Sequence, residues 1–200
     1  MMEERTRLFL ARHGETTLSS EFRYVGNMDV DITENGVDQM HNLKERFKNE
    51  NINAVYCSDL IRAKKGAEII ASCHDIKPTA CKEFREINLG IWEGLNREEI
   101  IEKYPDEYRM RLDNLAHSAI KEGESFKDLQ KRVMKKLTSV LNELKGKNIL
   151  LVAHGGVNRV ILFDVLKLDL QLLPRIDQTY GCLNIIDYYE DGPVVKLVNG

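Results

Sequence analysis

Short apolar runs alternate with longer amphipathic stretches along most of this chain. The apolar runs have the length and the branched side chains of buried strands, whereas the amphipathic stretches repeat apolar residues at helical spacing. The strands predicted in this way cover residues 6–11, 53–57, 77–82, 148–153, 182–189 and 194–198. The predicted helices cover residues 33–50, 58–71, 96–118, 125–146 and 157–166.

Polar residues and proline mark where several of these helices begin or break. Thr33 and Ser125 stand where a side-chain oxygen caps the first turn of a helix, and Ser58-Asp59 stand in the same place before another. Pro105 divides one predicted helix into two pieces. We therefore expect three helix caps, at Thr33, at Ser125 and at Ser58-Asp59. We also expect a helix boundary at Pro105.

The order of the elements predicts the fold class. Strands that alternate with helices favour a mainly parallel sheet with helices on both faces. We expect a three-layer α/β/α architecture in a single domain of residues 1–200, in which residues 86–125 form a small helical insertion that acts as a cap. Residues 14–32 carry no regular pattern, and a loop of that length is usually functional or disordered.

Composition excludes several classes of function. The 200 residues are 42% hydrophobic and 30% charged, with a formal net charge of −3, which disfavours a general nucleic-acid or membrane binder. The four cysteines form no zinc-binding pattern, and we expect free thiols in a cytoplasmic protein. Residues 1–5 lack the apolar core of a signal peptide, and no apolar run is long enough to span a membrane.

Two of the predicted strands end in the same His-Gly pair, at residues 10–14 and 151–155. The carboxyl ends of parallel strands meet at one edge of a sheet, and adjacent strands lie about 4.8 Å apart, so His13 and His154 could face one ligand. Arg12 disfavours the protonated imidazole beside it. Arg62, in the first turn of a helix just past a strand, adds a second guanidinium. Two imidazoles and two guanidiniums at one place suit the oxygens of a transferring phosphoryl group.

Five motifs, taken in order, resemble those of the histidine phosphatase superfamily, which includes the cofactor-dependent phosphoglycerate mutases. They stand at residues 12–16 (Arg-His-Gly-Glu-Thr), 24–36, 58–63 (Ser-Asp-Leu-Ile-Arg-Ala), 84–94 and 153–156 (Ala-His-Gly-Gly). The resemblance covers nearly the whole chain. It implies a phosphoglycerate mutase-like fold and metal-independent phosphoryl transfer with no cofactor.

The resemblance also implies a role for each matched residue. His13 is the nucleophile and becomes a phosphohistidine, while Glu86 protonates the leaving oxygen and then deprotonates the attacking water. Arg12, Arg62 and His154 bind and neutralise the phosphoryl group. The further contacts expected with the phosphate or substrate come from Gly14, Ser19, Val25, Gly26 and Gly155.

The segment around the expected acid departs from the pattern of the mutases. Mutases of the family carry Glu-Arg-x-Tyr there, whereas this chain has Glu-Ile-Asn-Leu at residues 86–89. The loss of two polar contacts to a small anionic substrate favours a phosphatase. Within the family, residues 122–126 and 175–182 are most similar to the α-ribazole phosphatases. The expected partner is a small phosphomonoester, either α-ribazole 5′-phosphate or a broad range of esters, and a homodimer is possible.

Three other functions stay open from the sequence. The chain could be a phosphoglycerate mutase or sugar bisphosphatase of the same fold, or a non-catalytic phosphate-binding regulatory protein. A metallohydrolase that uses His13 and His154 is disfavoured, because flanking arginines repel a divalent cation and no third ligand has zinc-like spacing. The remaining histidines, His41, His74 and His117, are expected at the surface, and Trp92 is expected to pack in the interior.

Overall fold

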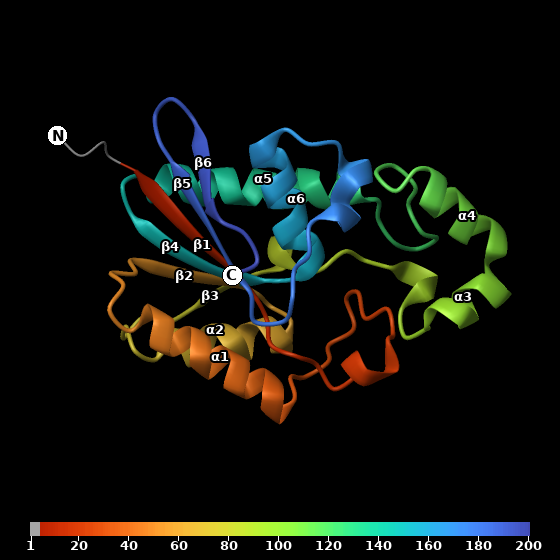
Figure 1. Cartoon of the computed structure of the whole chain (residues 1–200), viewed down its shortest axis with the longest axis horizontal. Helices are drawn as coiled ribbons and strands as arrows, with labels where there is room; N and C mark the ends of the chain where they lie inside the picture. Colours follow the sequence, from red (N-terminus) through yellow and green to blue (C-terminus); the bar gives the residue numbers. More distant parts are fainter. Residues whose placement is uncertain (1–4) are drawn as a thin grey trace.

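The computed structural model describes residues 5–200, which are built around a six-stranded sheet with the strand order β3-β2-β4-β1-β5-β6 (Figure 1). The strands are β1 (Thr6–Arg12), β2 (Ala54–Ser58), β3 (Thr79–Cys81), β4 (Asn148–Ala153), β5 (Leu183–Tyr188) and β6 (Pro193–Leu197). β1, β4, β2 and β3 run parallel, whereas β5 and β6 pair antiparallel at one side. The expected mainly parallel sheet is therefore confirmed.

Helices cover both faces of the sheet. The alternating side chains of β1 divide between two cores: Leu8 and Leu10 pack with α5 (Phe126–Glu143) and α6 (Gly155–Leu166). Phe9 and Ala11 point the other way and pack with α1 (Glu34–Phe47) and α2 (Ile61–Ala71). This alternation follows from the twofold repeat of a strand and confirms the three-layer α/β/α architecture.

Two of the three predicted helix caps are present. The Thr33 hydroxyl accepts a hydrogen bond from the amide of Gly36 at 3.0 Å, and the Ser125 hydroxyl accepts one from Asp128 at 3.1 Å. The third prediction was wrong, because α2 begins only after Leu60, which makes no side-chain cap. The carboxylate of Asp59 instead accepts two 2.7 Å hydrogen bonds from the guanidinium of Arg85.

The predicted insertion contains α3 (Arg97–Lys103) and α4 (Pro105–Asp113), with Pro105 at the start of the second helix as expected. Trp92, Ile100 and Ile120 form a small core of their own there. Figure 1 shows α3 and α4, in green, at one end of the molecule beyond the sheet. Their action as a cap, and the single domain of residues 1–200, stay predictions.

In the later part of the chain, two differences from the expected elements bear on the site and its surroundings. α6 begins at Gly155 rather than at Val157, so that His154 is the N-cap residue. A 3-10 helix, Leu170–Arg175, was not predicted. Within residues 5–200, no helix is long and apolar enough to cross a membrane. Most of the segment on which the expected lack of a signal peptide rests, residues 1–4, lies outside the described residues.

Candidate active site

His13 and His154 follow two strands that are hydrogen-bonded neighbours. β1 and β4 are paired in register up to Arg12 and Ala153, so the next residue of each strand lies at the same edge of the sheet. The centroids of the two imidazole rings are 5.1 Å apart, and the ring planes cross at 64°. The sheet therefore brings together two histidines that are far apart in the sequence.

The buried imidazole of His13 has a fixed tautomer. Its Nδ1 lies 2.7 Å from the carbonyl oxygen of Gly14. Because a carbonyl can only accept, Nδ1 carries the hydrogen and Nε2 keeps its lone pair. Burial, followed by the nearby charges of Arg62 and Arg12, holds the pKa of His13 well below its ordinary value. The ring is therefore neutral and nucleophilic at neutral pH.

His154 is fully buried beside it, and neither ring nitrogen has a hydrogen-bond partner among residues 5–200. Burial lowers the pKa of His154 far below its ordinary value, with the charge of Arg62 as the next cause. A buried polar group without a partner is costly unless a ligand satisfies it. The unpaired imidazole lies against the ring of His13, so a ligand bound at His13 is the expected source of its missing partner.

The two arginines of the site are held by backbone carbonyls rather than by carboxylates. Arg62, at the start of α2, donates 2.7 Å hydrogen bonds to the carbonyl oxygens of Met28 and Gly26. Arg12 donates to the carbonyl of Gln178, and its guanidinium carbon lies 3.9 Å from the centroid of the Tyr180 ring. Neutral partners orient a guanidinium without cancelling its charge, so both cations stay available to an anion.

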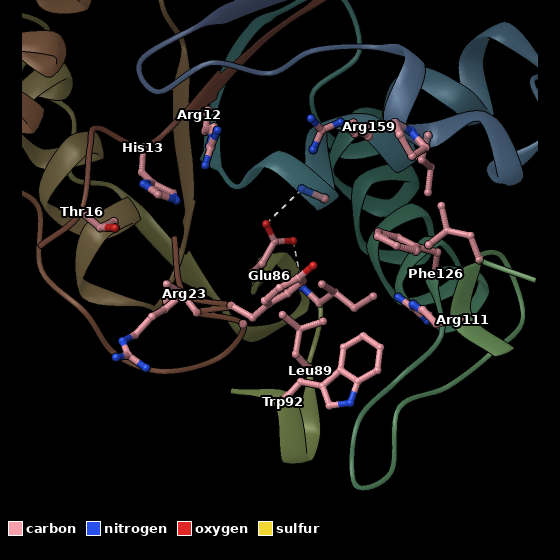
Figure 2. Close-up of a pocket in the computed structure, with 18 of the residues that line it drawn as sticks. Arg12, His13, Thr16, Arg23, Glu86, Leu89, Trp92, Arg111, Phe126 and Arg159 are labelled. Atoms are coloured by element: carbon pink, nitrogen blue, oxygen red, sulfur yellow. Dashed lines mark hydrogen bonds between the residues drawn. The ribbon is translucent and has the colours of Figure 1, made fainter. Parts of the chain in front are cut away.

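Glu86 reaches the same edge of the sheet from the segment after β3. One carboxylate oxygen accepts a 3.0 Å hydrogen bond from the amide of Gly156, and the other accepts one of 2.9 Å from the amide of Ile87 (Figure 2). A Cβ on Gly156 would lie 2.3 Å from the nearer carboxylate oxygen. The second glycine of the His-Gly-Gly motif therefore leaves the space that Glu86 fills.

The loop that carries Glu86 is held by Arg132 of α5. The Arg132 guanidinium donates to the carbonyl oxygens of Glu83 at 2.8 Å, Arg85 at 2.9 Å and Glu86 at 2.8 Å. It also binds the carboxylate of Glu124, with one hydrogen bond of 3.0 Å. One side chain thus fixes the backbone on which the expected acid sits.

A cavity of about 550 Å³ joins these groups. The predicted site residues that line it are Arg12, His13, Val25, Gly26, Arg62 and Glu86. The predicted residues that do not line it are Gly14, Ser19, His154 and Gly155. His154 lies directly against His13, whereas the hydroxyl of Ser19 donates a 3.1 Å hydrogen bond to Glu15. The expected contacts of all these residues with a substrate stay predictions.

Gly14, one of the residues expected to contact the phosphate, lies close to another segment of backbone. A Cβ at Gly14 would lie 2.2 Å from the carbonyl oxygen of Gly36, in the first turn of α1. The close contact is between two segments of backbone, and it fixes the path of the chain just after His13.

Sequence reasoning missed several residues that line the cavity, notably Arg159, Arg111 and Tyr180. Arg159 lies one turn along α6 from Gly155 and donates a 2.8 Å hydrogen bond to the carbonyl of Ile176. Its spacing from the His-Gly-Gly motif was a usable signal, because residues four apart share a helix face. Arg111 lies in a charged helix where no local pattern distinguishes it from its neighbours.

The structure also places the cysteines, the remaining histidines and Trp92. The four cysteines are free, and Trp92 is buried in the interior of the insertion. His41 and His117 are exposed, whereas His74 is half-buried. In the part of the chain that the structure describes, no group of three or more His, Cys, Asp or Glu side chains is arranged to hold a metal. The homodimer and the cytoplasmic location stay predictions.

Comparison with known proteins identifies the family of this arrangement. The profile of the Histidine phosphatase superfamily (branch 1) matches residues 8–200. A protein of Escherichia coli (strain K12) named "Adenosylcobalamin/alpha-ribazole phosphatase" is 24% identical over 193 residues, or 96% of this chain and 95% of that protein. One of Yersinia pestis (strain Pestoides F) named "Probable phosphoglycerate mutase GpmB" is 31% identical over 184 residues, or 92% of this chain and 85% of that protein.

Solved structures share the same fold. YhfR of Bacillus stearothermophilus superposes with a TM-score of 0.90 at 30% identity, over 96% of each chain. The α-ribazole phosphatase of Shigella flexneri also gives a TM-score of 0.90, at 24% identity over 97% of this chain and 96% of that one. The relatives thus include both a phosphatase and a mutase by name, and they leave the reaction of this chain to be argued from its own residues.

Proposed function

We propose that this chain, which belongs to the histidine phosphatase superfamily, hydrolyses small phosphomonoesters through a phosphohistidine formed on His13. The observation that carries the proposal is the neutral, buried imidazole of His13, held with its Nε2 lone pair free beside Arg12 and Arg62. A neutral nucleophile next to two fixed cations attracts a phosphoryl group and attacks it without losing a proton first.

In the first step, Nε2 of His13 attacks phosphorus and the bond from phosphorus to the ester oxygen breaks. Glu86, in its protonated form, gives its proton to the departing oxygen, so that the product is a neutral alcohol. Arg12 and Arg62 stabilise the charge on the phosphoryl oxygens as it is transferred. The amides of Gly156 and Ile87 hold the carboxylate that remains.

In the second step, water attacks phosphorus and the bond between phosphorus and Nε2 breaks. Glu86 takes a proton from this water and is ready for another cycle, while inorganic phosphate leaves. His13 returns to its starting tautomer, because its Nδ1 keeps its hydrogen, donated to the carbonyl oxygen of Gly14, throughout. The two steps together consume one water and release one alcohol and one phosphate.

The wall next to Glu86 favours hydrolysis over a mutase reaction. Ile87 and Leu89 line the cavity there, where the mutases of the family carry an arginine and a tyrosine, so that a carboxylate placed against this wall meets aliphatic side chains, while Arg159 lines the cavity on the side of α6. A polar group placed against such a wall loses its water without gaining a partner. The name of the Yersinia relative keeps phosphoglycerate mutase as the second candidate. The naming of relatives as α-ribazole phosphatases makes α-ribazole 5′-phosphate the first specific ester to test.

The proposal is tested by following phosphate release and the phosphoenzyme in the same samples. Purified protein is given phenyl phosphate, α-ribazole 5′-phosphate, and 3-phosphoglycerate with and without 2,3-bisphosphoglycerate. We expect steady phosphate release without the bisphosphate, and an acid-labile, base-stable phosphoryl label that His13→Ala abolishes. His41→Ala, at an exposed position on α1, is the matched control and is expected to keep both.

Each alternative has its own signature in this experiment. Interconversion of phosphoglycerates that needs the bisphosphate identifies a mutase. Binding of phosphate without turnover of any ester identifies a non-catalytic phosphate-binding protein. A phosphoryl label that persists in His13→Ala refutes the assignment of the nucleophile.

A further inference from the structure

Arg111, on α4, is a buried cation that the proposed reaction does not use. Its residue is only 5% exposed, and it lines the same cavity as His13. The guanidinium donates one hydrogen bond to the carbonyl of Ser118, and its central carbon lies 4.8 Å from the centroid of the Phe126 ring. Burial lowers the pKa of Arg111 to about 10, so that the group is still charged at neutral pH.

The surroundings of Arg111 resemble those of the phosphoryl-binding arginines rather than those of the structural ones. Structural arginines here pair with acids: Arg7 lies 2.6 Å from Asp187, and Arg85 lies 2.7 Å from Asp59. Over residues 5–200, no carboxylate forms an ion pair with Arg111. A buried charge without a counter-ion is destabilising. The missing anion is therefore to be sought in a ligand.

Arg111 is separated from the phosphoryl end by an apolar stretch of the cavity wall. Figure 2 shows Arg111 beside Phe126, on the other side of Leu89 and Trp92 from His13. Ile87 and Leu89 line the cavity without offering a side-chain hydrogen bond. A ligand that reaches both ends therefore needs an apolar segment next to the ester oxygen.

We infer that Arg111 forms a second anion-binding subsite, which selects phosphomonoesters whose leaving group carries a carboxylate at the far end of an apolar segment. The inference rests on the proposed phosphomonoesterase reaction and names the class of leaving group. It separates long acids from short ones by their dependence on Arg111, because a carboxylate next to the phosphoester reaches Ile87, Leu89 and Arg159 but not Arg111. It also predicts that the phosphate ester of an uncharged nucleoside such as α-ribazole binds more weakly than that of a long acid of similar size.

The experiment measures binding of phosphonates, which cannot be hydrolysed. Calorimetry compares alkylphosphonates with ω-carboxyalkylphosphonates of matched chain length, from phosphonoacetate to 6-phosphonohexanoate. We expect any gain from the carboxylate in phosphonoacetate to be independent of Arg111, and at least about tenfold tighter binding at one of the longer lengths, since a hydrogen bond to a charged group gives a gain of this order. Arg111→Met is expected to reduce that ratio to about one, and Arg111→Lys to keep part of it.

Arg109→Met is the matched control, because Arg109 lies on the same helix at an exposed position, and we expect it to keep the full ratio. A wild-type ratio near one at every length overturns the subsite, as does a ratio that survives in Arg111→Met. The binding ratios of the wild-type protein across the chain lengths test the subsite even if Arg111→Met fails to fold. If the ω-carboxyalkylphosphonates bind more tightly than the alkylphosphonates but the protein releases phosphate from no ester, the proposed hydrolysis is refuted and the subsite stands. Failure to bind any phosphonate overturns both.

Discussion

Gly156 places the expected proton donor by lacking a side chain. Its amide holds one oxygen of Glu86, and the space of its absent Cβ is taken by the other. Two features of one glycine thus act on one carboxylate. This explains why the motif at the end of β4 needs a second glycine, which the sequence alone leaves without a reason.

Gly156→Ala is expected to displace Glu86 and to lower kcat by about 100-fold or more, within the range that general acid catalysis contributes. The loss is larger for an alkyl phosphate, whose leaving oxygen needs a proton, than for 4-nitrophenyl phosphate. Steady-state kinetics on both esters measure the difference. Lys131→Ala, at an exposed position on α5, is the control and is expected to leave both rates unchanged. Equal losses on the two esters would contradict the role of Glu86.

The buried histidines make stability depend on pH. Burial holds the pKa of His13 and His154 well below that of a free imidazole, about 6.5, so the unfolded chain binds more protons than the native chain just below that pH. The free energy of unfolding is therefore expected to fall as pH decreases below 6.5, by up to about 1.4 kcal/mol per pH unit for each histidine.

Urea unfolding at a series of pH values measures this slope. His154→Asn is expected to reduce the slope by about one proton between pH 6.5 and pH 5, because one of the two imidazoles whose pKa is lowered most is gone. His117→Asn, at an exposed position, is expected to leave the slope unchanged. An unchanged slope in His154→Asn would show that its imidazole is protonated in the folded protein.

At the scale of elements, α5 positions the loop of Glu86 through Arg132, a residue that does not itself line the cavity. The helix is fixed at its start by the Ser125 cap and along its length by an apolar face in the larger core. Arg132 projects from it to the three carbonyls before and at Glu86. The position of the acid therefore depends on the packing of a helix that begins about 40 residues later in the sequence.

Arg132→Met is expected to cost about 2 kcal/mol or more of stability, because it leaves several carbonyls and the Glu124 carboxylate without their partner. It is also expected to lower kcat more for alkyl phosphates than for 4-nitrophenyl phosphate, as the Glu86 loop loosens. Lys131→Met, exposed on the same helix, is the control. A stability loss with equal kinetic losses on both esters would limit Arg132 to a structural role.

The sequence predicted those features that depend on local patterns. The strand ends at His13 and His154 and the caps at Thr33 and Ser125 each lie within a few residues that carry the signal. The cap at Ser58-Asp59 was wrong because Asp59 pairs with Arg85, which is 26 residues away. A local pattern carries no information on such a partner.

The candidate site contains residues of both kinds, those marked by a local sequence pattern and those that depend on a distant partner. Arg12 and Arg62 stand in contiguous motifs, and both line the cavity. Arg111 and Arg132 depend on the folded path of other segments: one lies against Phe126, and the other binds carbonyls of residues 83–86. Carbonyls are present at every position, so the sequence cannot single out those that bind a guanidinium.

At the scale of the whole molecule, the positive groups around His13 predict an activity that needs no divalent cation. Two guanidiniums flank the imidazoles and repel such an ion, and the proposed steps use only side chains and water. Phosphate release is expected to be unchanged after exhaustive treatment with EDTA and in buffers with or without Mg²⁺. A loss of activity that Zn²⁺ or Mn²⁺ restores would revive the metallohydrolase and contradict the proposed mechanism.

The order of the sheet has a consequence for how the molecule opens. β1 and β4 are interior strands covered on both faces, whereas α3 and α4 pack mainly on the small core around Trp92. In hydrogen-deuterium exchange, the amides of residues 8–12 and 149–153 are expected to exchange only with global unfolding, and those of residues 97–113 several orders of magnitude faster. Leaving groups are then expected to enter and depart through local opening of the insertion, while His13 and His154 stay at the ends of the slowest-exchanging strands.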